Sequence, residues 1–150
     1  MSVDMRPSKL DKITVRGFKS IRELVDFKLR NINVIVGANG AGKSNFLEIF
    51  EILSAMMKPE GLSEYVAGAA DAYFFGGPKL TRKIEIKLRL GKNGYDFNFI
   101  PSENGAFIIA KEQRHFNNGC SNFTRNFPAP SYDAQLPNEF NSKATEYTYP

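Results

Sequence analysis

The stretch that decides the fold is INVIVGANGAGKS, which runs from Ile32 to Ser44. Its first five residues are mostly apolar, as in strands that are buried on both faces of a mostly parallel sheet. The next eight, Gly37 to Ser44, fit the pattern G-x-x-x-x-G-K-[ST] of a phosphate-binding loop, or P-loop. That pattern requires a strand before it and a helix after it, and both are predicted here.

The residues of this loop explain how it would bind phosphate. Gly37, Gly40 and Gly42 let the backbone bend so that successive N–H groups point to one place, at the positive end of the following helix. Lys43 can then reach the β- and γ-phosphates, and the Ser44 hydroxyl can ligate a Mg²⁺ ion that bridges the same oxygens. The loop therefore predicts a site for a di- or triphosphate.

The segments on either side of the loop predict a helix and a hairpin. After Lys43, apolar residues recur every three or four positions as far as Met57, which predicts a helix buried over much of its girth and ended by Pro59 and Gly61. A second, short helix is expected within 63–70. Before the loop, the alternating stretches 10–18 and 24–29 predict two strands that form a hairpin.

The second half of the chain predicts an antiparallel meander. Residues 83–90 read KIEIKLRL, a strict alternation, and two shorter strands are expected around 95–99 and 106–111, each after a short turn. From 117 to 150 the sequence has no periodicity, which indicates an irregular loop or linker. We therefore expect an α/β fold of the P-loop NTPase type, with an antiparallel β-subdomain at about 81–116.

The loop and its surroundings resemble a known family. The stretch GANGAGKSN, the helix start NFLE and the upstream GFKSI look like the Walker A region and first hairpin of ABC-type ATPase heads, in particular the SMC, RecF and OLD group of AAA family ATPases. The resemblance, which covers roughly residues 10–116, implies ATP and Mg²⁺ as ligands. It places these residues around the nucleotide: Gly37, Ala38, Asn39, Gly40, Ala41, Gly42, Lys43, Ser44 and Asn45.

The same resemblance implies roles for two residues outside the loop. Lys19, in the hairpin turn, would contact a phosphate. Gln113 would be the Q-loop glutamine that reaches Mg²⁺ and the attacking water. Lys43 and Gln113 would then be the catalytic residues, and Ser44 and Gln113 the metal ligands.

Parts of the family pattern are missing from the sequence. After Ser44 no apolar run ends in Asp-Glu, and there is no Ser-Gly-Gly signature, so neither a Walker B carboxylate nor a catalytic glutamate is found. In the relatives these parts lie in a C-terminal lobe, beyond a helical insertion. We therefore expect 1–116 to be an ATP-binding N-terminal lobe and 117–150 to lead toward such an insertion.

For the intact protein, the resemblance implies ATP hydrolysis coupled to DNA processing, DNA repair or anti-phage defence. It also implies a homodimer or another head-to-head assembly, with DNA and a nuclease as possible partners. One alternative is a non-catalytic nucleotide-binding or interaction fragment, which the missing Walker B motif favours. Another is a small nucleotide kinase or GTPase, against which stands the lack of an N-K-x-D motif.

Composition excludes several further classes. The chain has 150 residues, 42% of them hydrophobic and 24% charged, as in one ordinary globular domain. No apolar run is long enough for a bilayer and the N-terminus is polar, so we expect a cytoplasmic protein without membrane contact. The lone Cys120 and the lone His115 argue against an internal disulfide and a zinc site. The net charge of +4 is modest and arises mainly in the first fifty residues.

Overall fold

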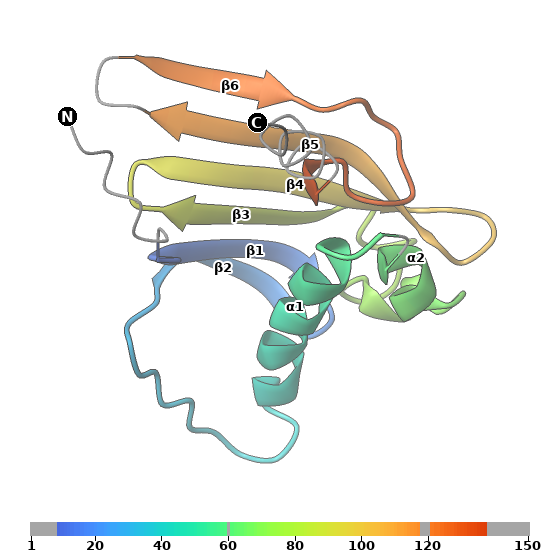
Figure 1. The fold of residues 1–150 in the computed structure, drawn as a ribbon. Helices are drawn as coiled ribbons and strands as arrows, with labels where there is room; N and C mark the ends of the chain where they lie inside the picture. The colour runs from blue at the N-terminus through green and yellow to red at the C-terminus, as the bar shows by residue number, and fades with distance from the viewer. Residues whose placement is uncertain (1–8, 60, 118–120, 138–150) are drawn as a thin grey trace.

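A computed structural model describes residues 9–59, 61–117 and 121–137, and within them six strands and two α-helices (Figure 1). The strands are β1 (Lys12–Phe18), β2 (Ile21–Lys28), β3 (Ile84–Leu90), β4 (Asn93–Pro101), β5 (Phe107–Asn117) and β6 (Asn122–Asn126). The helices are α1 (Lys43–Met56) and α2 (Gly61–Val66), and a 3₁₀ turn, η1, spans Ala70–Tyr73. The fold is therefore mixed α/β, as the sequence predicts.

All six strands belong to one sheet in the order β2-β1-β3-β4-β5-β6, and every neighbouring pair is antiparallel. The predicted hairpin is β1–β2, and the predicted meander is β3–β4–β5. Strand β1 also pairs directly with β3, from Lys12 opposite Arg89 to Arg16 opposite Glu85. The loop and helices between residues 29 and 83 are thus an insertion between two halves of a continuous sheet (Figure 1).

The sheet has one apolar face and one charged face because its strands alternate. On β3, Ile84, Ile86 and Leu88 are buried, whereas Glu85 and Lys87 lie on the opposite face. The apolar face is rich in aromatic rings, among which Phe99 and Phe107 stack with their centroids 4.5 Å apart. This face forms the core together with α1, α2 and η1.

Helix α1 packs on the apolar face with one side, not with most of its girth as the sequence predicts. Phe46, Ile49 and Ile52 are buried, and the Phe46 ring meets Phe27 of β2 edge-on at 5.4 Å. Leu47, in contrast, is 57% exposed. The apolar side of α1 that faces away from the sheet therefore has no layer over it within the described residues.

The prediction of a buried strand at Ile32 to Val36 is wrong for this structure. The segment belongs to no strand, and Ile32, Val34 and Val36 are each more than 80% exposed. The physical reason is that a strand needs a hydrogen-bonded neighbour, and the described strands form only antiparallel pairs with one another. The segment is therefore apolar, but among the described residues no neighbouring strand pairs with it and no layer covers it.

The prediction of an irregular segment from 117 onward misses one strand, because residues 122–126 form β6. Strand β6 pairs with β5 along the sheet edge, and the chain then folds back so that Phe127 and Leu136 reach the core. Every residue of β6 is exposed, so pairing and not burial defines it, and such a strand has no hydrophobic periodicity. Cys120 and residues 138–150 lie outside the described residues.

The buried Glu112 holds this returning segment. Its carboxylate accepts hydrogen bonds from the Tyr95 hydroxyl at 2.7 Å and from the backbone N–H groups of Gln135 and Leu136, each at 2.8 Å. Burial, followed by the neighbouring Glu112 charge, raises the pKa of Tyr95, so its hydroxyl stays protonated and donates. In sequence, Glu112 looks like an ordinary charge near a strand end, but it connects β4, β5 and the segment after β6.

Candidate functional site

The glycine-rich loop leads into α1 through backbone conformations that favour glycine. Gly40 has φ of 81° and Gly42 has φ of 91°, both in the left-handed region. No side chain caps α1, its first turn contains no acidic residue, and the N–H groups of Lys43, Ser44 and Asn45 have no acceptor among the described residues. A helix start with free N–H groups and positive polarity can bind an anion.

Lys43 and Ser44 stand at this helix start. The Lys43 ammonium donates to the carbonyl oxygens of Gly37 at 2.6 Å and of Ala38 at 2.7 Å, so it bridges the two ends of the loop. Ser44 is exposed, and no described residue bonds to its hydroxyl. The ammonium and the hydroxyl are thus both at the surface of the loop, where a phosphate and its Mg²⁺ would require them.

The β1–β2 hairpin lies against the loop through Ser20, a residue for which the sequence alone predicts no role. The Ser20 hydroxyl accepts a hydrogen bond from the Asn45 side-chain amide at 2.8 Å. A Cβ atom on Gly42 would lie 2.4 Å from the Ser20 oxygen, so another residue there would displace the Ser20 hydroxyl and would also be strained by the φ of 91°. The signal for this contact was the GFKSI stretch, in which Ser20 directly follows Lys19.

Lys19 itself pairs with α1, and among the described residues no hydrogen bond or ion pair joins its side chain to the loop 37–45. Its ammonium forms an ion pair with Glu48 and lies 4.4 Å from the centre of the Tyr73 ring. Its backbone is fixed as well, because its N–H donates to the Tyr73 carbonyl at 2.7 Å. Burial, followed by the charge of Glu48, raises the pKa of Tyr73, so a neutral ring faces the ammonium.

The structure does not bring Gln113 to the loop. Gln113 lies on β5 opposite Asp96, on the charged face of the sheet, and its side-chain amide donates to Asn126 of β6. Helix α1 covers the other face, and β5 is three strands away from β1, about 14 Å at the usual strand spacing. Ser44 and Gln113, the two expected ligands of Mg²⁺, therefore lie on opposite sides of the sheet.

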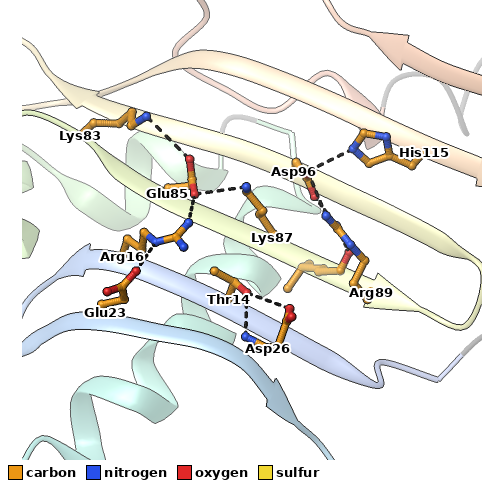
Figure 2. A network of polar contacts seen from close by, with 11 residues as sticks. Thr14, Arg16, Glu23, Asp26, Lys83, Glu85, Lys87, Arg89, Asp96 and His115 are labelled. Atoms are coloured by element: carbon orange, nitrogen blue, oxygen red, sulfur yellow. Dashed lines mark hydrogen bonds and ion pairs between the residues drawn. The ribbon is translucent and has the colours of Figure 1, made fainter.

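The charged face carries polar pairs, most of them between neighbouring strands (Figure 2). Glu85 accepts from Arg16 at 2.6 Å and lies 3.3 Å from the Lys87 ammonium, and Asp96 pairs with Arg89 and with His115. Burial opposes ionisation of both carboxyls, but these donors outweigh it and lower the pKa of each below its ordinary value.

These carboxylates are held by basic partners, and among the described residues no group of His, Cys, Asp and Glu has the arrangement of a metal site. The charged face therefore ties the strands together and shows no catalytic grouping.

Comparison with known proteins identifies the family. The family model described as an AAA ATPase domain matches residues 9–126, which is most of the chain and includes the loop, α1 and all six strands. The chain belongs to the AAA ATPase domain family. An AAA ATPase domain binds a nucleotide, usually with Mg²⁺. In this chain the start of α1 has no side-chain cap.

The AAA ATPase domain ends, by this match, at the last residue of β6, so the family unit includes the edge strand that the sequence pattern did not predict. No curated protein and no solved structure matches the chain. Within the described part, no helix is both long enough and apolar enough to cross a membrane.

Proposed function

We propose that this AAA ATPase domain binds ATP with Mg²⁺ at the loop 37–45. One observation carries the proposal: the motif G-x-x-x-x-G-K-[ST] leads directly into a helix whose first N–H groups have no acceptor among the described residues. Those N–H groups would bind the β- and γ-phosphates, and the exposed Ser44 hydroxyl would ligate the ion that bridges them.

Lys43 supplies the charge for this binding. Its ammonium now rests on the carbonyl oxygens of Gly37 and Ala38, which are neutral acceptors. A phosphate oxygen is a better acceptor because it carries charge, so the ammonium would exchange at least one carbonyl for phosphate when a nucleotide enters. No backbone movement beyond the loop is required, since the carbonyls belong to the loop itself.

The domain supplies half of a hydrolytic site in this proposal. The sequence holds no Walker B carboxylate after Ser44, and Gln113 lies on the far side of the sheet from α1. The exposed apolar segment 32–36 and the uncovered side of α1 support the same view, because both have the composition of surfaces packed against further strands and helices. We assign residues 1–116 as the main part of an N-terminal lobe of the SMC, RecF and OLD type.

In that proposal the complementing lobe, from elsewhere in the protein or from a partner, would add the carboxylates that hold Mg²⁺ and orient water. The family resemblance also implies ATP hydrolysis in the intact protein, coupled to DNA processing or anti-phage defence. It further implies assembly as a homodimer and a DNA or nuclease partner. Lys19 as a phosphate contact and Gln113 as a Q-loop residue remain proposals on the same basis.

Calorimetric titration with ATP and Mg²⁺ tests the nucleotide site. Lys43→Ala is expected to weaken binding roughly tenfold to a hundredfold, the effect of losing a charge-assisted contact. Lys92→Ala is the matched control. Lys92 is exposed in the β3–β4 turn, so this substitution removes the same charge at a site outside the loop. Equal affinities in the wild type and in Lys43→Ala would refute the assignment.

A non-catalytic nucleotide-binding module is the second candidate function. The separation of Gln113 from Ser44 favours it, because the two expected metal ligands do not meet in this chain. The two candidates differ in turnover and not in binding, so a phosphate-release assay in the presence of a complementing lobe separates them. Hydrolysis that depends on Lys43 would support the ATPase, and binding without hydrolysis would support the module.

A further inference from the structure

Lys19 lies beside the phosphate-binding loop, and its ammonium pairs with a carboxylate of α1. It is the first residue of the hairpin turn, and the next residue, Ser20, touches Gly42 and Asn45 of the phosphate-binding loop. The ammonium nevertheless lies on Glu48 and over the Tyr73 ring. A cation next to the predicted phosphate site is therefore held by a carboxylate of the helix that starts there.

We propose that Lys19 pairs with Glu48 only while the loop holds no triphosphate, and that the terminal phosphate of a bound nucleotide competes with Glu48 for the Lys19 ammonium. With a triphosphate in the loop, the Lys19 ammonium leaves Glu48 for the phosphate; with a diphosphate or with no nucleotide, it stays on Glu48. This inference rests on the proposed function of the loop and adds a specificity residue, Glu48, that would set the preference for ATP over ADP.

The distances along the helix allow this exchange. Glu48 follows Ser44 by four residues in α1, which corresponds to about 6 Å at the usual helical rise. The lysine side chain has a flexible four-carbon stem and can cover such a distance by rotation of its own bonds. The backbone of Lys19 need not move, and its bond to the Tyr73 carbonyl can remain.

The electrostatics around Glu48 explain why the exchange would require a strong anion. Glu51 lies on the same side of α1, one turn further on, and accepts a hydrogen bond from the Tyr65 hydroxyl at 2.8 Å. Lys19 is the one cation that pairs with Glu48 among the described residues. If Lys19 leaves, Glu48 stays half-buried beside a second carboxylate, which is unfavourable. The negative charge of a γ-phosphate would offset this loss of the Glu48 ion pair. A diphosphate carries less negative charge and would offset it less.

The affinities of four proteins for ATP and for ADP test the inference by calorimetry in Mg²⁺. Glu48→Gln frees Lys19 and is expected to tighten ATP binding roughly threefold to tenfold, with a smaller effect on ADP. Lys19→Met is expected to weaken ATP binding and to bring the ATP and ADP affinities closer together. The double variant is expected to behave like Lys19→Met. Glu103→Gln is the control, since it removes the same charge from the exposed β4–β5 turn, outside the loop and α1.

Three results would overturn the inference. The first is a Glu48→Gln protein that binds ATP no more tightly than Glu103→Gln. The second is a Lys19→Met protein with an unchanged ratio of ATP to ADP affinity, which decides the matter even if Glu48→Gln fails to fold. Either result, with binding still lost in Lys43→Ala, would leave the proposed function intact and make the pair a structural tie. The third is a wild type that binds neither nucleotide, which would overturn both proposals.

Discussion

Replacing Glu112 by alanine should destabilise the protein by about 3 to 5 kcal/mol, although the residue lies outside the nucleotide site. The Glu112 side chain is 1% exposed and accepts hydrogen bonds from the Tyr95 hydroxyl and from two backbone N–H groups. The hydroxyl of Tyr95 and the N–H of Leu136 are both buried, and each would lose its acceptor at about 1 to 3 kcal/mol. Gln135 is partly exposed, so water can replace the carboxylate there.

Glu112→Gln refines this prediction because it keeps the volume of the side chain. One oxygen, Oε1, accepts from both Tyr95 and Leu136, and an amide oxygen can do the same. The amide nitrogen would then face the N–H of Gln135, a donor against a donor. We therefore expect a loss of about 1 to 2 kcal/mol for Glu112→Gln, less than for Glu112→Ala.

Urea unfolding followed by circular dichroism measures both variants. Glu103→Ala is the matched control: Glu103 is exposed in the β4–β5 turn, and its replacement should change the free energy of unfolding by no more than about 0.5 kcal/mol. If Glu112→Ala unfolds at the same urea concentration as Glu103→Ala, then the carboxylate does not hold the segment after β6, and the reasoning fails.

Three further predictions concern the sheet and the site. Ile86→Asp buries an unpaired carboxylate between β1 and β4 and should lower the free energy of unfolding in urea by several kcal/mol. Lys87→Gln, on the charged face, should change it by about 0.5 kcal/mol or less. Similar losses in the two variants would contradict the assignment of β3 residues to the two faces. The lowered pKa of Asp96 contributes stability that is present above the ordinary value of 3.8 and is lost as the pH falls through the folded-state value. Asp96→Asn should therefore be less stable than the wild type at pH 7, and the difference should shrink below pH 3.8. A constant difference in the free energy of unfolding across this range would exclude linkage to Asp96. The 150-residue chain alone should release phosphate from ATP no faster than background, and robust turnover that Lys43→Ala abolishes would mean that these residues form a complete site.

Most of the sheet could be predicted from the sequence because its strands obey a simple rule. The alternation KIEIKLRL at 83–90 predicts β3 and the side of each residue, since one face of an antiparallel sheet packs on a core and the other meets water. Local turns then determine the antiparallel order of β3, β4 and β5. Ile86 is buried and Lys87 is on the open face, as that rule requires.

The rest depends on contacts that a local pattern cannot report. Ile32 to Val36 has the composition of a buried strand, but composition does not say whether neighbouring strands are present. Glu112 is buried because three donors from distant positions meet it. At the site, the sequence predicts the loop at 37–44, whereas the contact of Ser20 with Gly42 and the pairing of Lys19 with Glu48 need the fold.

Because β1 pairs directly with β3, we expect the fold to survive proteolytic cleavage of the segment between the hairpin and the phosphate-binding loop. Residues 31–40 are exposed throughout, and Lys28 and Arg30 stand just before them, so trypsin should cleave there first. A nicked molecule would not fall apart, because the piece before the cut stays bound to the piece after it through the whole β1–β3 ladder and the core contacts of Ile13 and Val15. The two fragments, made separately, should therefore reassemble on mixing, with the phosphate-binding loop at the new end of one of them.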